Sequence, residues 1–138
     1  RQMCIRDSFN PTIIESREEK NRYFVALCES NINYCLENYH LSPPYQSRVH
    51  FWISDNPHGP AKYCSPFTKQ GARHRVPEGP EDPRFMYITP LGNNKTPILH
   101  MTFIHNMTIH LAQVHFNITN QGCSVQVTND FGYVGEWN

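Results

Sequence analysis

The chain has 138 residues, with 12 Lys and Arg against 12 Asp and Glu, so its formal net charge is zero. A neutral chain lacks the basic excess that proteins use to neutralise nucleic-acid phosphates or to bind an anionic membrane surface. Aromatic residues make up 12% and charged residues 17% of the chain, which argues against disorder. No apolar run approaches the ~20 residues of a membrane-spanning helix. We therefore expect a globular chain that does not bind nucleic acid and does not insert into a membrane.

The two ends of the chain suggest a fragment. Residues 1–8 (RQMCIRDS) resemble a translated sequencing-adapter remnant, so we expect them to be non-native and exclude them from the fold. Residues 9–138 then form a single domain. Because no Met opens the chain and its last residues, 135–138, form no polar tail, we expect this domain to come from a longer protein.

Cysteines and glycosylation sequons bear on the cellular compartment. Without Cys4 the chain keeps an even number of cysteines, compatible with two disulfides in any of three connectivities: Cys28, Cys35, Cys64 and Cys123. None of them is spaced Cys-x-x-Cys, so a zinc ribbon or a thioredoxin-like motif is not supported. N-glycosylation sequons begin at Asn94, Asn106 and Asn117, about twice the number expected by chance. Together these features predict an extracellular or secretory-pathway protein.

Residues 16–39 carry a helical pattern. Ser16 followed by Glu19 fits a capping box at a helix start. Apolar residues then recur at helical spacing: Phe24, Leu27, Cys28, Ile32, Cys35, Leu36 and Tyr39. We predict an N-terminal amphipathic helix packed on a mainly antiparallel β-sheet, an α+β fold. In such a helix Cys28 and Cys35 would lie about 10 Å apart, too far to bond each other. The alternative is an all-β sandwich, in which residues 23–28 form a strand.

The middle of the chain alternates between a strand and loops. Residues 47–54 predict a strand, because apolar Val49, Phe51 and Ile53 alternate with their neighbours. Residues 55–60 predict a turn. Residues 65–83, rich in Pro and Gly, predict a long loop, a kind of segment that is often functional. This loop contains a basic cluster that could bind an anion or a partner: Lys69, Arg73, His74 and Arg75.

The last third is rich in Thr, Ile, Val and Phe, which favours strands. We predict strands over residues 85–89, 98–105, 109–118 and 123–128. A helical face can also be drawn through residues 103–118, so this alternative stays open.

Four of the eight histidines recur every five residues: His100, His105, His110 and His115. On a helix or on a single strand they would point in different directions. A hairpin turning at residues 106–109 would place His105 opposite His110 and His100 opposite His115, with Cβ atoms about 5 Å apart. These pairs would lie on opposite faces of the sheet, so they could provide two metal half-sites that lack a third ligand. The alternative is a set of polar side chains on a solvated face.

The tripeptide His100-Met101-Thr102, preceded by Ile98 and Leu99, resembles one half of the two-histidine phosphodiesterase motif. The resemblance implies a histidine acid or base next to a hydroxyl that positions a phosphate. That fold needs two such motifs, and the chain has no second copy. A Gly-x-Ser-x-Gly elbow, a P-loop and a Gly-x-Gly-x-x-Gly motif are also missing.

We therefore predict a non-catalytic recognition or structural domain, without a cofactor, from a larger secreted or membrane-anchored protein. Exposed aromatic side chains would bind a protein or a glycan: Tyr45, Trp52, Tyr63, Tyr133 and Trp137. Three alternatives remain: a histidine-dependent metalloprotein, a truncated enzyme like the two-histidine phosphodiesterases, and a viral coat or spike fragment.

Overall fold

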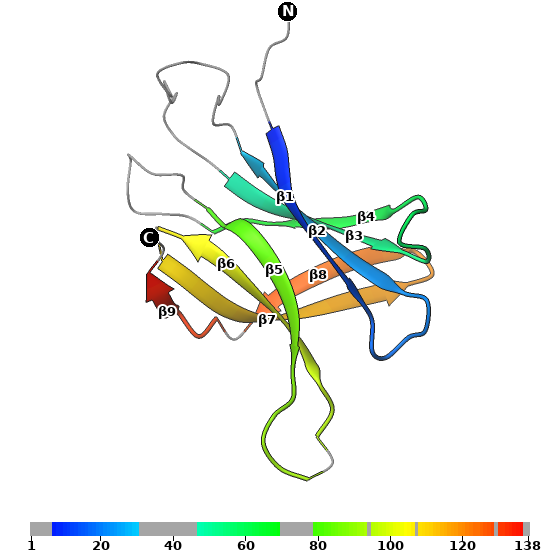
Figure 1. Cartoon of the computed structure of the whole chain (residues 1–138). Coiled ribbons are helices and arrows are strands. Elements are labelled where there is room, and N and C mark those ends of the chain that lie inside the picture. Colours follow the sequence, from blue (N-terminus) through cyan, green and yellow to red (C-terminus); the bar gives the residue numbers. More distant parts are fainter. Residues whose placement is uncertain are drawn as a thin grey trace, which may run out of the picture.

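The computed structural model describes residues 7–30, 47–69, 79–93, 95–106, 108–128 and 130–136. These residues form two antiparallel sheets that pack into a β-sandwich, as Figure 1 shows. The first sheet has its strands in chain order: β1 (Asp7–Glu15), β2 (Tyr23–Ser30), β3 (Ser47–Ser54) and β4 (Lys62–Phe67). The second follows the same rule: β5 (Glu81–Ile88), β6 (Ile98–His105), β7 (Thr108–Thr119) and β8 (Gly122–Thr128), with β9 (Tyr133–Glu136) also paired to β7. The described residues contain no helix that could span a membrane.

The core lies between the two sheets and follows mainly from the alternation of side chains along the strands. In β2 and β3 every second side chain is buried, as expected for strands with one solvated face. The largest fully buried side chains are Phe51 on β3 and Phe103 and Met101 on β6. Each such side chain contributes roughly 1.5–3 kcal/mol of burial free energy. The core therefore depends on both sheets, and the two layers stabilise each other.

The predicted N-terminal helix is wrong. The described residues contain no helix, and residues 23–30 form β2, as the all-β alternative proposed. The Ser16 cap does form, because its hydroxyl accepts hydrogen bonds from the amides of Glu18 (3.2 Å) and Glu19 (3.1 Å). It stabilises the β1–β2 turn, which the bond from the Ser16 amide to the Arg22 carbonyl (2.7 Å) closes. A capping signal marks a turn equally well, and the aromatic and β-branched residues 23–25 then favour a strand.

The strands expected at residues 47–54, 98–105, 109–118 and 123–128 are confirmed within one residue at each end. The helical alternative through residues 103–118 is wrong. The long loop expected over residues 65–83 is wrong at both ends, where β4 and β5 form. Sequence analysis also missed β1. The strand predicted at residues 85–89 forms as part of β5, which begins four residues earlier than expected. Pro11, Pro66 and Pro83 lie within β1, β4 and the start of β5, and they hid these segments. All three are edge strands, where proline does not break the ladder.

Both open sides of the sandwich are closed by contacts between edge strands. On one side, Asn10 in β1 and Asp82 in β5 each precede a proline, adopt positive φ and mark a bulge in their strand. The Asn10 side-chain amide donates a hydrogen bond to the Asp82 carboxylate. On the other side, a disulfide joins Cys64 in β4 to Cys123 in β8. The two sheets are therefore held together at both edges, by a polar contact and by a covalent bond.

Glu81, next to the first of these contacts, predicts a pH dependence of stability. Burial, and secondly the negative charge of Asp82, raise the pKa of Glu81 from 4.5 to about 7. The folded protein thus binds more protons than the unfolded chain between these values, and stability falls as pH rises through this range. Glu81→Gln should raise the free energy of unfolding by about 1–2 kcal/mol at pH 8, allowing for partial exposure.

Urea unfolding at pH 4 and pH 8 measures this effect. The variant should gain stability relative to the wild type at pH 8 and gain little at pH 4. Glu15→Gln, which removes an exposed carboxylate from β1, is the matched control. An equal effect of both substitutions at both pH values would contradict the role of Glu81.

Candidate functional site

Two groups of side chains stand out from the framework. The first, called here the histidine cluster, lies at the end of the sandwich around the β6–β7 hairpin: Lys69, His105, Asn106, Thr108, His110 and Asp130. The second, called here the outer face, is the solvent side of the first sheet around Trp52 and Tyr63.

The β6–β7 hairpin sets the geometry of the histidine cluster. His105 pairs with Thr108, so the turn is shorter than expected, and Asn106 adopts the positive φ of 50° that short hairpin turns require. The predicted hairpin is therefore present, but its register differs by two residues. Phe103 faces His110, and His105 lies diagonally across from His110 on the same inner face. Met107 and Ile109 are not typical turn residues, so the sequence did not indicate the register of this hairpin.

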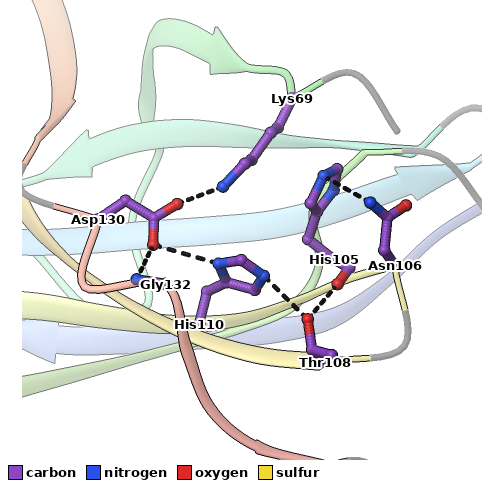
Figure 2. Close-up of polar contacts among 7 residues, drawn as sticks. All are labelled: Lys69, His105, Asn106, Thr108, His110, Asp130 and Gly132. Atoms are coloured by element: carbon purple, nitrogen blue, oxygen red, sulfur yellow. Dashed lines mark hydrogen bonds and ion pairs between the residues drawn. The ribbon is translucent and has the colours of Figure 1, made fainter. Parts of the chain in front are cut away.

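Asp130 is the centre of the cluster, as Figure 2 shows. Its carboxylate accepts hydrogen bonds from the Lys69 ammonium, from Nδ1 of His110 (3.2 Å) and from the Gly132 amide (2.7 Å). Burial alone would raise the pKa of Asp130, but the hydrogen bonds from Lys69, Gly132 and His110 outweigh it and hold the pKa below its usual value. Asp130 therefore stays ionised. Its hydrogen bonds link the segment that follows β4 to β7 and to the β8–β9 connection.

Asp130, His110 and Thr108 form a carboxylate–imidazole–hydroxyl chain, the arrangement that activates nucleophiles in some hydrolases. Nε2 of His110 lies 3.0 Å from the Thr108 hydroxyl. That hydroxyl donates to the backbone carbonyl of His105 at the shorter distance of 2.7 Å. With its proton used there, the hydroxyl has no proton to give to Nε2 of His110. The chain is therefore built as a structural tie across the hairpin, and Thr108 is not poised as a nucleophile.

His105 caps the core next to this chain. It is only 4% exposed, and burial, reinforced by the positive charge of Lys69, lowers its pKa. The Asn106 amide nitrogen lies 3.3 Å from Nε2 of His105. The His110 ring stacks on Phe103 with centroids 5.3 Å apart, and the Lys69 ammonium lies over the Phe103 ring, 5.8 Å from its centroid. The cluster thus closes the open end of the hydrophobic core with polar groups.

The four histidines do not converge on one metal site. His105 and His110 approach each other, with ring centroids 5.5 Å apart. His100 lies on the other face of the second sheet, where it stacks against Phe131 and its Nδ1 lies 2.8 Å from the Ile98 carbonyl. His115 is exposed opposite Gln126. Within the described parts of the chain, no set of three His, Cys, Asp or Glu side chains is arranged to hold a metal ion.

The predicted disulfide cysteines behave differently from one another. Cys64 and Cys123 are bonded to each other. Cys28, which we expected to form a disulfide, is a fully buried free thiol on β2, and burial raises its pKa to about 12. Cys35 lies outside the described residues. A buried, protonated thiol of this kind behaves as a small core residue.

The predicted sequons and the basic cluster are only partly described. Asn117 is exposed on the solvent side of β7, whereas Asn106 is half-buried and its Oδ1 is buried without a partner in the described residues. Asn94 lies outside these residues. Lys69 contacts Asp130, and the rest of the predicted basic cluster lies outside the described residues: Arg73, His74 and Arg75. Two of the predicted aromatic residues, Tyr45 and Trp137, also lie outside the described residues, and of Tyr133 in β9 only the backbone is described.

A row of apolar side chains crosses all four strands of the outer face. Strand register aligns Ile13 with Val25, Val25 with Trp52, and Trp52 with Tyr63. Ile13 is 51% and Tyr63 is 45% exposed, while Val25 and Trp52 are half-buried. The Trp52 and Tyr63 rings meet edge to face, with centroids 5.3 Å apart. Sequence analysis identified Trp52 and Tyr63 but could not join them to Ile13 and Val25, because the pairing of strands was unknown.

A hydrogen-bonded polar group lies beside this row. The Glu29 carboxylate accepts from Nη2 of Arg48 (2.8 Å) and contacts Nε2 of His50 (3.0 Å), while Nδ1 of His50 lies 2.8 Å from the Tyr63 hydroxyl. Burial would raise the pKa of Glu29, but Arg48 and His50 lower it below the usual value. These contacts fix the orientation of the Tyr63 ring. In the sequence, the alternation in residues 47–54 already indicated that Arg48, His50 and Trp52 lie on the same face of the strand. This pattern could have pointed to the polar group.

No family model matches the chain, and neither the curated proteins nor the solved structures contain a significant match. The geometry of the two groups therefore carries the functional argument.

Proposed function

We propose that this chain is a non-catalytic recognition domain of a secreted or luminal protein, and that it binds a protein partner through the outer face. The observation that carries the proposal is the row of Ile13, Val25, Trp52 and Tyr63 on solvent-facing strand positions. Aromatic side chains with a hydrogen-bonding group at one end are the preferred anchors of protein interfaces.

Three features favour a protein over a glycan. The Trp52 and Tyr63 rings are inclined by 65° and do not form one flat platform on which a sugar ring could stack. The row continues into the aliphatic side chains of Val25 and Ile13, which suit an apolar protein surface. Arg48 and Glu29 lie beside the row as a paired charge group, as at the polar rim of an interface.

The positions of the disulfide and of the sequons support a secretory location and an accessible outer face. Disulfides such as Cys64–Cys123 persist mainly in oxidising compartments. All three sequons, at Asn94, Asn106 and Asn117, belong to the part of the chain that follows β5, and none lies in β1–β4. Glycans at these positions would attach to the second sheet and its loops, so they would leave the outer face free for a partner.

The proposal predicts that Tyr63→Ala strongly weakens binding. The labelled domain would be applied to an array of purified secreted and cell-surface ectodomains and, in parallel, to a glycan array. We expect a protein ligand whose affinity falls about 30-fold in Tyr63→Ala, the effect of losing an interface hot spot. Gln126→Ala, on the solvent side of β8, is the matched control and should bind like the wild type.

Thermal unfolding of both variants verifies that they are folded. Absence of any ligand on the protein array would contradict the proposal, as would a ligand that binds Tyr63→Ala normally. Binding to the glycan array alone would identify the outer face as a sugar site and would overturn the assignment of a protein partner.

A further inference from the structure

The second sheet divides at one end and creates a cavity that the proposed function does not use. β6 and β7 are paired from His105 and Thr108 as far as His100 and Gln113. Beyond this point β6 remains paired with β5, and β7 remains paired with β8. Figure 1 shows the β5–β6 hairpin and the β7–β8 hairpin running in different directions from the point of divergence.

A cavity of about 370 Å³ lies in this fork. Its floor consists of core side chains from both sheets: Phe24, Leu99, Val114 and Phe116. The rings of Phe24 and Phe116 are stacked there, with centroids 4.2 Å apart. A volume at the lower end of the ~300–1,000 Å³ range and an apolar floor are typical of small-molecule sites. The divergence of the strands thus gives a small ligand access to the edge of the core.

The mouth of the cavity carries polar groups, including Glu18, Thr96 and His115. Glu18 carries the only formal charge among the described residues that line it. In the described residues no Lys or Arg forms an ion pair with this carboxylate. The guanidinium of the adjacent Arg17 lies instead over the Tyr87 ring, at 5.0 Å from its centroid, and does not line the cavity. The mouth therefore complements a positive charge.

We propose that this cavity binds a small primary amine with an aromatic or aliphatic body. The body fills the space above Phe24 and Phe116, and the ammonium group pairs with Glu18 at the mouth. Aromatic walls add to the attraction, because ring faces favour nearby cations. The proposal is independent of the outer face, which lies on the solvent side of the first sheet and shares no residue with the cavity.

A titration of the ¹⁵N-labelled protein at pH 7.5, followed by NMR, tests the proposal with three probes: 2-phenylethylamine, 2-phenylethanol and phenylacetate. We expect the amine to bind about fivefold more tightly than the alcohol, the upper effect of a partly exposed ion pair, and phenylacetate to bind more weakly still. The amide signals that shift should come from Thr96, Ile98 and Leu99 and from residues 113–116.

Substitutions at two exposed positions, each with a control, distinguish the contribution of the Glu18 charge from that of the open cavity. Glu18→Gln should remove the preference for the amine, whereas Glu15→Gln should not. Thr96→Trp should block the mouth and abolish binding of the amine, whereas Lys95→Trp, at the neighbouring exposed position, should leave it intact. Absence of amine binding, equal affinity for amine and acid, or binding that survives Thr96→Trp would each overturn the proposal.

Discussion

Replacing both Cys64 and Cys123 by alanine is expected to lower the free energy of unfolding by about 4 kcal/mol. The two cysteines are 59 residues apart in the sequence, and a cross-link that closes a loop of this length restricts the unfolded chain by about that amount. The bond also joins β4 to β8 at a side of the sandwich where the two sheets meet only through edge strands. Urea unfolding of the oxidised wild type and the double variant measures the difference.

Reduction provides the control for this prediction. A phosphine reductant should destabilise the wild type to a similar extent and leave the double variant unchanged. Cys28→Ala, which removes a buried thiol without removing a cross-link, should cost much less. If reduction leaves the wild type as stable as before, the disulfide does not hold the two sheets together.

Gly79→Ala is expected to destabilise the fold by about 3 kcal/mol or more. Gly79 is buried immediately before β5 and has a φ of +105°, which L residues with a side chain rarely adopt. A Cβ at this position would lie 2.0 Å from the backbone oxygen of Ser47 in β3. Backbone strain and the clash act together, because β3 is central in the first sheet and cannot move away without cost.

Gly122→Ala is the matched control for this substitution. A Cβ at Gly122 has no neighbouring atom within 4 Å, and its φ is not in the left-handed region. The change should alter the free energy of unfolding by less than about 0.5 kcal/mol. Equal effects of Gly79→Ala and Gly122→Ala, measured by urea unfolding, would show that the close approach of Gly79 to β3 is not required.

The sequence predicted β3, β6, β7 and β8 well, but it missed β1, β4 and the start of β5 and predicted a helix where β2 forms. Apolar residues alternate clearly in residues 47–54, because that strand has one face in the core, and residues 98–105 are rich in strand-forming residues. Both strands begin and end as expected. The edge strands β1, β4 and β5 contain prolines, and their short-range signal is that of a loop. The local pattern of Ser16 and residues 23–28 is compatible with a helix and also with a strand. Only packing against the second sheet decides between them, and a sequence pattern does not contain that information.

The candidate sites were predicted only in part, because they also depend on contacts between residues that are far apart in the sequence. The hairpin between His105 and His110 followed from their spacing, but its register depends on the turn, and Asn106 was the only typical turn residue there. Asp130 lies 20 residues from His110 in the sequence, so no local pattern links them. Likewise, Ile13 joins Trp52 and Tyr63 only through the pairing of four strands.

The central claim is that this chain is a disulfide-closed sandwich from a glycosylating compartment, with the outer face left free. A non-reducing peptide map of the protein secreted from animal cells, with glycosidase treatment in ¹⁸O-water, tests it most directly. We predict a linked peptide containing Cys64 and Cys123, a free Cys28, and an ¹⁸O label at Asn117, the exposed sequon. Free thiols at Cys64 and Cys123 together with an unlabelled Asn117 would contradict both the closure of the sandwich and the proposed secretory function.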